Sequence, residues 1–157
     1  MPSISNSSPT TYRTASRRFR VYVAAGSTER LLVAQPWIDR LIAAGINVVD
    51  WTRDPNWSLD HSPNEAELIE SAQRDLVAVK ECDLFWYIVP EQKSEGAASE
   101  LSLAQTLGKR IVASGSFGAR NIFALLIPRE MRFASNKDAF AAVVEAEANY
   151  RKFGGEF

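Results

Sequence analysis

Apolar residues gather in five short runs along the chain, and segments with helical spacing separate most of these runs. The runs are short and rich in β-branched and aromatic residues, which is typical of strands. They cover residues 19–24, 46–50, 83–89, 110–113 and 131–134. The run at 83–89 is the most apolar and predicts a central strand that is buried on both faces.

Helical patterns fill the intervals. They predict a first helix that ends at Gly45, then helices over 64–80, 96–107, 121–126 and 137–152. Pro36 leaves two starts open for the first helix, either after the turn at 25–28 or near Gln35. Asn64 and Asn136 are the expected N-caps of their helices. The buried stripe of the 64–80 helix is expected to be Leu68, Ile69, Ala72, Leu76 and Val79.

Alternation of strands and helices predicts a single α/β domain with a flavodoxin-like (Rossmann-like) fold. The expected sheet has five parallel strands in the order 2-1-3-4-5, with helices on both faces. We expect the domain to span residues 18–153. Residues 1–17, rich in Ser, Thr and Pro, are expected to form a disordered tail, and residues 154–157 a C-terminal tail.

Composition narrows the possible functions. Eighteen Lys and Arg against nineteen Asp and Glu give a formal net charge of -1, which argues against a nucleic-acid partner. No apolar run is long enough to cross a membrane. One cysteine, Cys82, fits a cytoplasmic protein without disulfides, and one histidine, His61, argues against a His-based triad. We expect no metal and no cofactor.

A glycine-to-lysine block, Gly96–Lys109, follows the central strand and contains Glu100. In the predicted topology this segment meets the turn Ala25-Gly26-Ser27 at the crevice where the strand order reverses. Glu100 is therefore either an ordinary surface residue of its helix or the centre of a site. A carboxylate among small residues, with a second carboxylate and aromatic walls, suits cleavage of a glycosidic bond.

Two further residues have open interpretations. Asp75 lies near the apolar stripe of its helix, and periodicity alone favours a solvated edge position over a site position. Trp51 opens a polar loop that extends to Pro63, and its ring either covers the core or forms a stacking wall for a flat ligand.

The block Gly96-x-x-x-Glu100-Leu101-x-x-Ala104-x-x-x-Gly108-Lys109 resembles the signature of the nucleoside 2-deoxyribosyltransferase family, which includes related deoxynucleoside-monophosphate N-glycosidases. The spacing of Asp75 and Asp83 and the first-strand ending Tyr22–Ser27 are also similar to that family. The likeness spans about residues 20–144.

This resemblance implies that Glu100 is the nucleophile at the anomeric carbon, and that Asp75 orients the sugar or assists the leaving base. It implies a nucleoside or nucleotide substrate and a homo-oligomer. The other site residues that it implies line the sugar or a 5′-phosphate (Ala25, Gly26, Ser27, Arg30, Gly96, Ala97), stand near the base (Trp51), or are lent by a neighbouring subunit (Asn121).

Departures from the family pattern favour cleavage over transfer. Ser102 stands where the family usually has glycine, and Ser94 or Glu95 occupies the loop region where the transferases usually carry an aspartate. Two alternatives stay open at this point. One is a non-catalytic nucleotide-binding or regulatory module of the same fold, and the other is an activity similar to that of the Toll/interleukin receptor-like NAD glycohydrolases.

Overall fold

A single parallel sheet forms the centre of the protein. The structure, a computed structural model, describes residues 18–26, 30–51, 54, 56, 60–117 and 121–153, apart from the side chains of residues 30 and 31. The strand order is β2-β1-β3-β4-β5, and every pair is parallel, which confirms the predicted fold. The strands are β1 (Arg20–Ala24), β2 (Asn47–Val48), β3 (Leu84–Ile88), β4 (Arg110–Ser114) and β5 (Arg132–Phe133).

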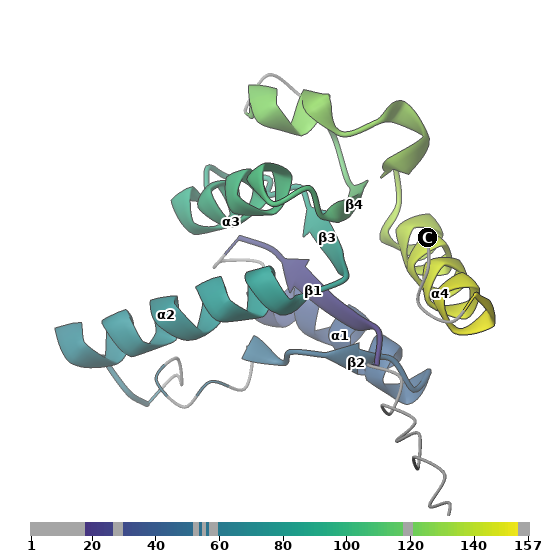
Figure 1. The fold of residues 1–157 in the computed structure, drawn as a ribbon. Coiled ribbons are helices and arrows are strands. Elements are labelled where there is room, and N and C mark those ends of the chain that lie inside the picture. Colours follow the sequence, from purple (N-terminus) through teal and green to yellow (C-terminus); the bar gives the residue numbers. More distant parts are fainter. Residues whose placement is uncertain are drawn as a thin grey trace, which may run out of the picture.

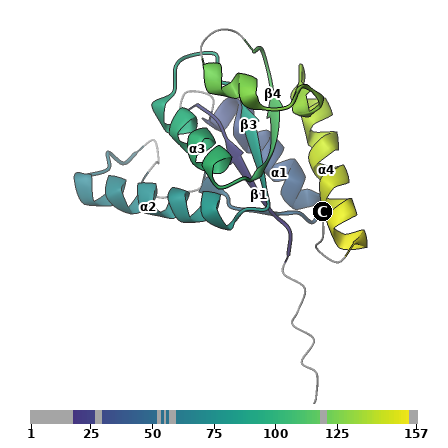
Figure 2. The same ribbon diagram turned by 45° about the horizontal axis from the view of Figure 1, so that its top comes forward.

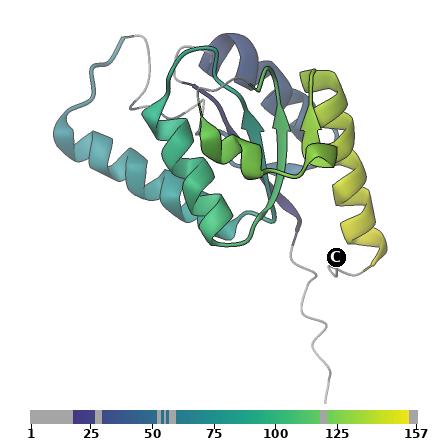
Figure 3. The same cartoon turned by 90° about the horizontal axis from the view of Figure 1, so that it is seen from above.

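Helices cover both faces of this sheet (Figures 1 and 3). The helical elements are η1 (Arg30–Ala34), α1 (Gln35–Ala43), α2 (Glu65–Glu81), α3 (Glu95–Thr106), η4 (Ile122–Leu126), η5 (Arg129–Met131) and α4 (Asn136–Lys152). Alternate residues of β3 point to opposite faces, so Trp86 packs with α1 and α4 while Phe85 and Tyr87 pack with α2 and α3. All five residues of β3 are buried, as predicted for the central strand.

The first α-helix begins at Gln35, which settles the two starts that the sequence left open. Pro36 lies in its first turn, where a missing backbone N–H costs no helical hydrogen bond. A short π-helix, η1, precedes it. Ile38 and Leu41 are fully buried against the sheet.

Helix α2 begins as predicted but presents a different face to the sheet. Asn64 accepts a hydrogen bond from the Glu67 backbone N–H, and the Glu67 side chain accepts one from the Asn64 N–H, so that a full capping box starts the helix. The predicted buried stripe is wrong, except for Val79. Its apolar members Leu68, Ile69 and Leu76 are 40–50% exposed. The inward positions are Ser71, Ala78 and Val79, with Asp75 half-buried.

The reason lies in the position of the helix. Its first turns extend beyond the sheet (Figure 1), and Leu68 and Ile69, which belong to these turns, are exposed. The inward face carries Ser71 and the half-buried Asp75 before Ala78 and Val79, so it has no continuous apolar stripe. The spacing of apolar residues in α2 therefore predicts the wrong inward face for this helix.

Helix α4 has its cap one residue earlier than predicted. Ser135 accepts the hydrogen bond from the Asp138 backbone N–H. Asn136, the expected cap, instead accepts a hydrogen bond through Oδ1 from the Ser114 hydroxyl at 2.6 Å. The same hydroxyl accepts the indole N–H of Trp86 at 2.8 Å. Ser114 is completely buried, so these bonds join β3, β4 and α4 inside the core.

Replacing Ser114 by alanine tests this link. The Trp86 indole N–H and the Asn136 side chain would both lose a partner, and burying unsatisfied polar groups costs about 1–3 kcal/mol of unfolding free energy. We expect urea unfolding to measure a loss in that range for Ser114→Ala. Ser102→Ala, at an exposed position of α3, is the matched control and should change stability by less than about 0.5 kcal/mol. Equal losses in the two variants would contradict the structural role of Ser114.

No helix in the described part of the chain has the length and hydropathy that crossing a bilayer requires.

Candidate active site

A cavity of about 420 Å³ opens beside the carboxyl ends of β1 and β3. In an open parallel sheet of this order, the strand connections diverge at this place and leave a crevice. Its lining comes from β1 and the turn after it, the segment after β2, helix α2, and the N-terminal part of α3. The lining residues are Tyr22, Ala25, Trp51, Asp54, Asp75, Lys93, Ser94, Glu95, Gly96, Ala97 and Glu100.

The N-terminal turn of α3 places Glu100 at this cavity. Ser94 caps the helix by accepting a hydrogen bond from the Ala97 backbone N–H at 3.3 Å. Ala97, Leu101 and Ala104 are buried and fix the rotation of the helix against the sheet. Glu100 directly precedes the buried Leu101 in the helix, and its side chain faces the cavity and Asp75.

Burial and the negative charge of Asp75 determine the pKa of Glu100. Removal from water raises its pKa, the nearby carboxylate of Asp75 raises it further, and a hydrogen bond from the Tyr22 hydroxyl lowers it. The result is a pKa of about 8, well above the ordinary glutamate value of 4.5. In the ligand-free protein at neutral pH, Glu100 therefore carries a proton most of the time.

Tyr22 is a site residue that the sequence analysis did not single out. Burial raises its pKa well above 10, and the carboxylates of Glu100 and Asp75 add to this effect, so the phenol stays a neutral donor. Its side chain is only 1% exposed. The sequence did contain an indication of this role, because Tyr22 lies in a predicted strand of the sheet. A buried phenol needs a hydrogen-bond partner, and here the partner is Glu100 of α3.

Trp51 combines the two roles that the sequence left open. Its indole N–H donates to the Val23 carbonyl at 2.6 Å, and its ring packs against both hydrophobic clusters. The residue also lines the cavity. One anchored ring thus covers the core and presents an aromatic surface to the cavity.

The other predicted residues divide into three groups. Ala25, Gly96 and Ala97 line the same cavity as Glu100. A Cβ at Gly96 would meet no protein atom within 4 Å, so packing within the protein does not require glycine there. Gly26 is buried beside Ala25 and is not part of the lining. Ser27 and the side chain of Arg30 lie outside the described residues.

Asn121 lines a different, neighbouring cavity of about 570 Å³. Its side chain accepts the Phe123 backbone N–H at 3.0 Å and donates to the Tyr87 hydroxyl at 3.4 Å. The segment that contains Asn121 lies beside α3 (Figure 2), and the Gln105 side chain donates to the Phe123 carbonyl. The two cavities share the wall 93–95. Within one chain, Asn121 and Glu100 therefore line two different cavities, which residues 93–95 separate.

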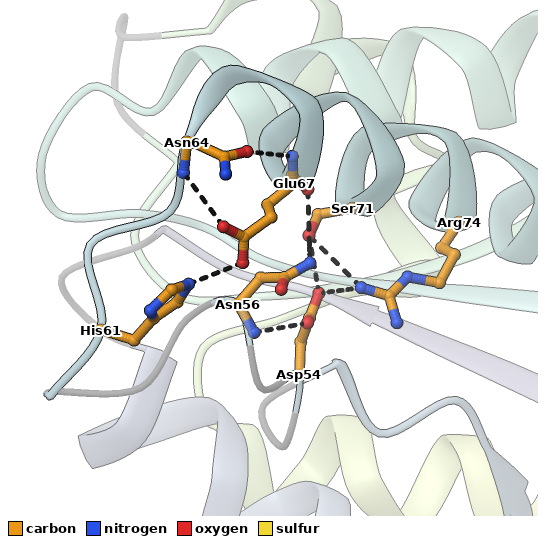
Figure 4. A network of polar contacts seen from close by, with 7 residues as sticks. All are labelled: Asp54, Asn56, His61, Asn64, Glu67, Ser71 and Arg74. Carbon is orange, nitrogen blue, oxygen red and sulfur yellow. Dashed lines mark hydrogen bonds and ion pairs between the residues drawn. The ribbon is translucent and has the colours of Figure 1, made fainter.

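Asp54 is the second site residue that sequence reasoning missed. It lines the same cavity as Trp51 and Asp75, and Ser71 and Arg74 of α2 hold its carboxylate (Figure 4). The loop composition gave no signal, because the partners are distant in sequence. In the part of the chain that the structure describes, no group of three or more His, Cys, Asp and Glu side chains is arranged to hold a metal ion.

Solved structures with this fold include enzymes that act on N-glycosidic bonds. A 2-deoxyribosyltransferase of Bacillus psychrosaccharolyticus matches with a TM-score of 0.59 at 17% identity, covering 80% of this chain and 90% of that one. One from Leishmania mexicana matches with a TM-score of 0.56 at 15% identity over 81% and 97% of the two chains. The CMP N-glycosidase of Clostridium botulinum matches with a TM-score of 0.51 at 21% identity over 79% and 97%.

No protein-family model matches the chain. No curated protein matches its sequence. At 15–21% identity, the similarity to the solved structures is one of fold. The resemblance that the block Gly96–Lys109 suggested is thus confirmed at that level: the chain has the fold of the 2-deoxyribosyltransferases and of the CMP N-glycosidase.

Proposed function

We propose that this protein is an enzyme that cleaves the N-glycosidic bond of a nucleoside or nucleotide, with Glu100 as the nucleophile. The observation that carries the proposal is the shared cavity of Glu100 and Asp75, in which Tyr22 donates a hydrogen bond to Glu100. The fold that the chain shares with N-glycosidic enzymes supports it. Among the described lining residues, the groups suited to attack an anomeric carbon are carboxylates.

In the first step, a carboxylate oxygen of Glu100 attacks C1′ of the sugar. The C1′–N bond breaks, its electron pair stays on the base nitrogen, and the base leaves after it takes up a proton. The sugar is then held as an ester of Glu100. Positive charge develops on the sugar in the transition state, and the two carboxylates stabilise it.

Glu100 must give up its proton before its carboxylate attacks, and the leaving base must gain one. In the proposed step, Asp75, the second carboxylate of the pair, accepts the Glu100 proton and passes it on, or solvent carries this proton to the base nitrogen. We assign to Asp75 the transfer of a proton towards the base, or a hydrogen bond that orients a sugar hydroxyl. The Tyr22 hydroxyl stabilises Glu100 as it becomes anionic, because its hydrogen bond favours the charged form.

In the second step, water attacks C1′ and gives up one proton to Asp75 or to solvent, and the ester bond to Glu100 breaks, which releases the sugar and restores the carboxylate. A second free base at the same place would give transfer in place of hydrolysis. Ser102 and the loop before Glu100, where the chain departs from the transferase pattern, favour water as the acceptor. Trp51 is expected to stack against the base.

Assembly into a homo-oligomer is part of this proposal. Apolar residues of α2 and η4 are exposed on the single chain, including Ile69, Leu76, Ile122 and Leu126. Such residues are common at contacts between copies. Light scattering after size-exclusion chromatography measures the mass of the assembly, and a monomer at every concentration would contradict this part.

Replacing Glu100 tests the chemistry. We expect the purified protein to release free base from at least one member of a panel of ribonucleosides, deoxynucleosides, their 5′-monophosphates and NAD, and chromatography measures the release. Glu100→Gln should lower kcat by at least about 10³-fold, because it removes the nucleophile and keeps the side-chain shape. Glu70→Gln, at an exposed position of α2, is the matched control and should retain full activity.

Release of base in water alone identifies a hydrolase, and release that needs a second base identifies a transferase. Binding of a nucleotide without turnover, with equal affinity in wild type and Glu100→Gln, would contradict the enzymatic proposal. It would support a nucleotide-binding module of the same fold.

The raised pKa of Glu100 predicts the pH dependence. Because the carboxylate is the reactive form, kcat/KM for base release should rise with pH to a plateau, with a midpoint near the Glu100 pKa of about 8. Asp75→Asn removes the negative charge that raises this pKa, so the midpoint should move to lower pH. Tyr22→Phe removes the hydrogen bond that lowers it, so the midpoint should move to higher pH. Shifts in the same direction in both variants would contradict the assignment.

A further inference from the structure

Three donors from two elements hold the carboxylate of Asp54 (Figure 4). Its Oδ2 accepts the Ser71 hydroxyl at 2.9 Å and an Arg74 Nη2–H at 2.8 Å. Its Oδ1 accepts the Asn56 backbone N–H at 3.0 Å. The Asp54 side chain is only 9% exposed, so this carboxylate is fixed rather than free to rotate in water.

These contacts tie the segment after β2 to helix α2. The Asn56 side chain donates to the Ser71 hydroxyl and to the Glu67 carbonyl, both at 3.3 Å. Arg74, the charged partner of Asp54, directly precedes Asp75 in the helix. The position of the Asp54 carboxylate is therefore coupled to the helix that carries a proposed site residue.

Asp54 is an acceptor at neutral pH. Burial by itself raises the pKa of this carboxyl, but the Asn56 N–H, the Ser71 hydroxyl and the Arg74 guanidinium together hold its pKa below the ordinary value. An ionised carboxylate accepts hydrogen bonds and donates none. It offers about four acceptor positions. Donors of the described residues occupy three of them.

The residue that carries this carboxylate belongs to a cavity wall. Asp54 lines the cavity of Glu100, three residues after Trp51, whose ring lines the same cavity. Ligand pockets combine aromatic surfaces with a few polar groups that fix the orientation of the ligand, and an acceptor beside a stacked ring is placed to contact the edge of a heterocycle. Glu100 and Asp75 are the groups at the sugar end.

We propose that Asp54 is a specificity-determining residue that accepts a hydrogen bond from an exocyclic amino group of the substrate base. This inference rests on the proposed function for the identity of the ligand. The carboxylate favours amino-bearing bases such as cytosine and adenine. It disfavours their oxo counterparts uracil and hypoxanthine, because these present a carbonyl oxygen to a fixed anion. Arg74 and Ser71 act through Asp54 as positioning residues.

The test uses Asp54→Asn, which keeps the size of the side chain and adds an amide donor. Two comparisons are made, cytosine against uracil and adenine against hypoxanthine. In each, the two bases differ mainly in the replacement of an amino group by an oxo group. Calorimetry measures the affinity of the full-length protein for the four free bases, and kcat/KM is measured for the matching nucleosides. We expect wild type to prefer the amino-bearing member at least about tenfold, as a charge-assisted hydrogen bond implies. Asp54→Asn should reduce this preference to about twofold or reverse it.

Two further variants make the result specific. Asp54→Ala should also lose the preference, and thermal melting shows that each variant is folded. Glu67→Gln is the matched control in the same network. Its side chain contacts His61 and the Asn64 N–H but does not line the cavity, and glutamine preserves the capping box. We expect the wild-type preference and wild-type affinities in this control.

The outcomes separate this inference from the proposed function. An amino preference in binding that disappears in Asp54→Asn supports the inference even if no base is ever released, a result that would end the enzymatic proposal alone. Base release with equal rates for amino and oxo members overturns the inference alone. The inference is also overturned if folded Asp54→Asn loses affinity for the amino and the oxo base by the same factor. A wild-type protein that neither binds nor cleaves any of the compounds overturns both.

Discussion

Two acidic side chains in one cavity are the constraint on which the rest of the site depends. Glu100 on α3 and Asp75 on α2 come from helices that cover the same face of the sheet, and both line the crevice beside β1 and β3. Burial and the nearby charge of Asp75 raise the pKa of Glu100 to about 8, so a second negative charge in this cavity is costly. Under the proposed function, positive charge that develops on the sugar would relieve this repulsion, and the cavity would favour the transition state over a neutral ground state.

The surroundings of this pair are built to hold it in place. Tyr22, buried in β1, donates to Glu100 and stays neutral because its burial, and then the same carboxylates, raise its pKa. The Asp54 carboxylate, which lines the same cavity, forms an ion pair with Arg74 at 2.8 Å.

The alternation of strands and helices was enough to predict the parallel sheet and its order, because right-handed connections leave few other arrangements for five such strands. The apolar run of β3 predicted its central place because a strand that helices cover on both faces is apolar throughout. The inward face of α2 could not be predicted from apolar periodicity, since Ser71 and Asp75 face inward while Leu68 and Leu76 lie exposed. Asp54 was also beyond the reach of the sequence, because its α2 partners Ser71 and Arg74 lie 17 and 20 residues away and only the fold brings them together.

Trapping the covalent intermediate tests the central claim most directly. A substrate nucleoside with fluorine at C2′ slows both steps, because an electronegative atom beside C1′ destabilises positive charge there. With a good leaving base, the fluorosugar ester should accumulate. Intact-protein mass spectrometry should then show one added fluoroglycosyl group, and tryptic digestion should place it on Glu100 within the peptide 94–109. Turnover of the natural substrate with no adduct, or an adduct on another residue, would contradict the account.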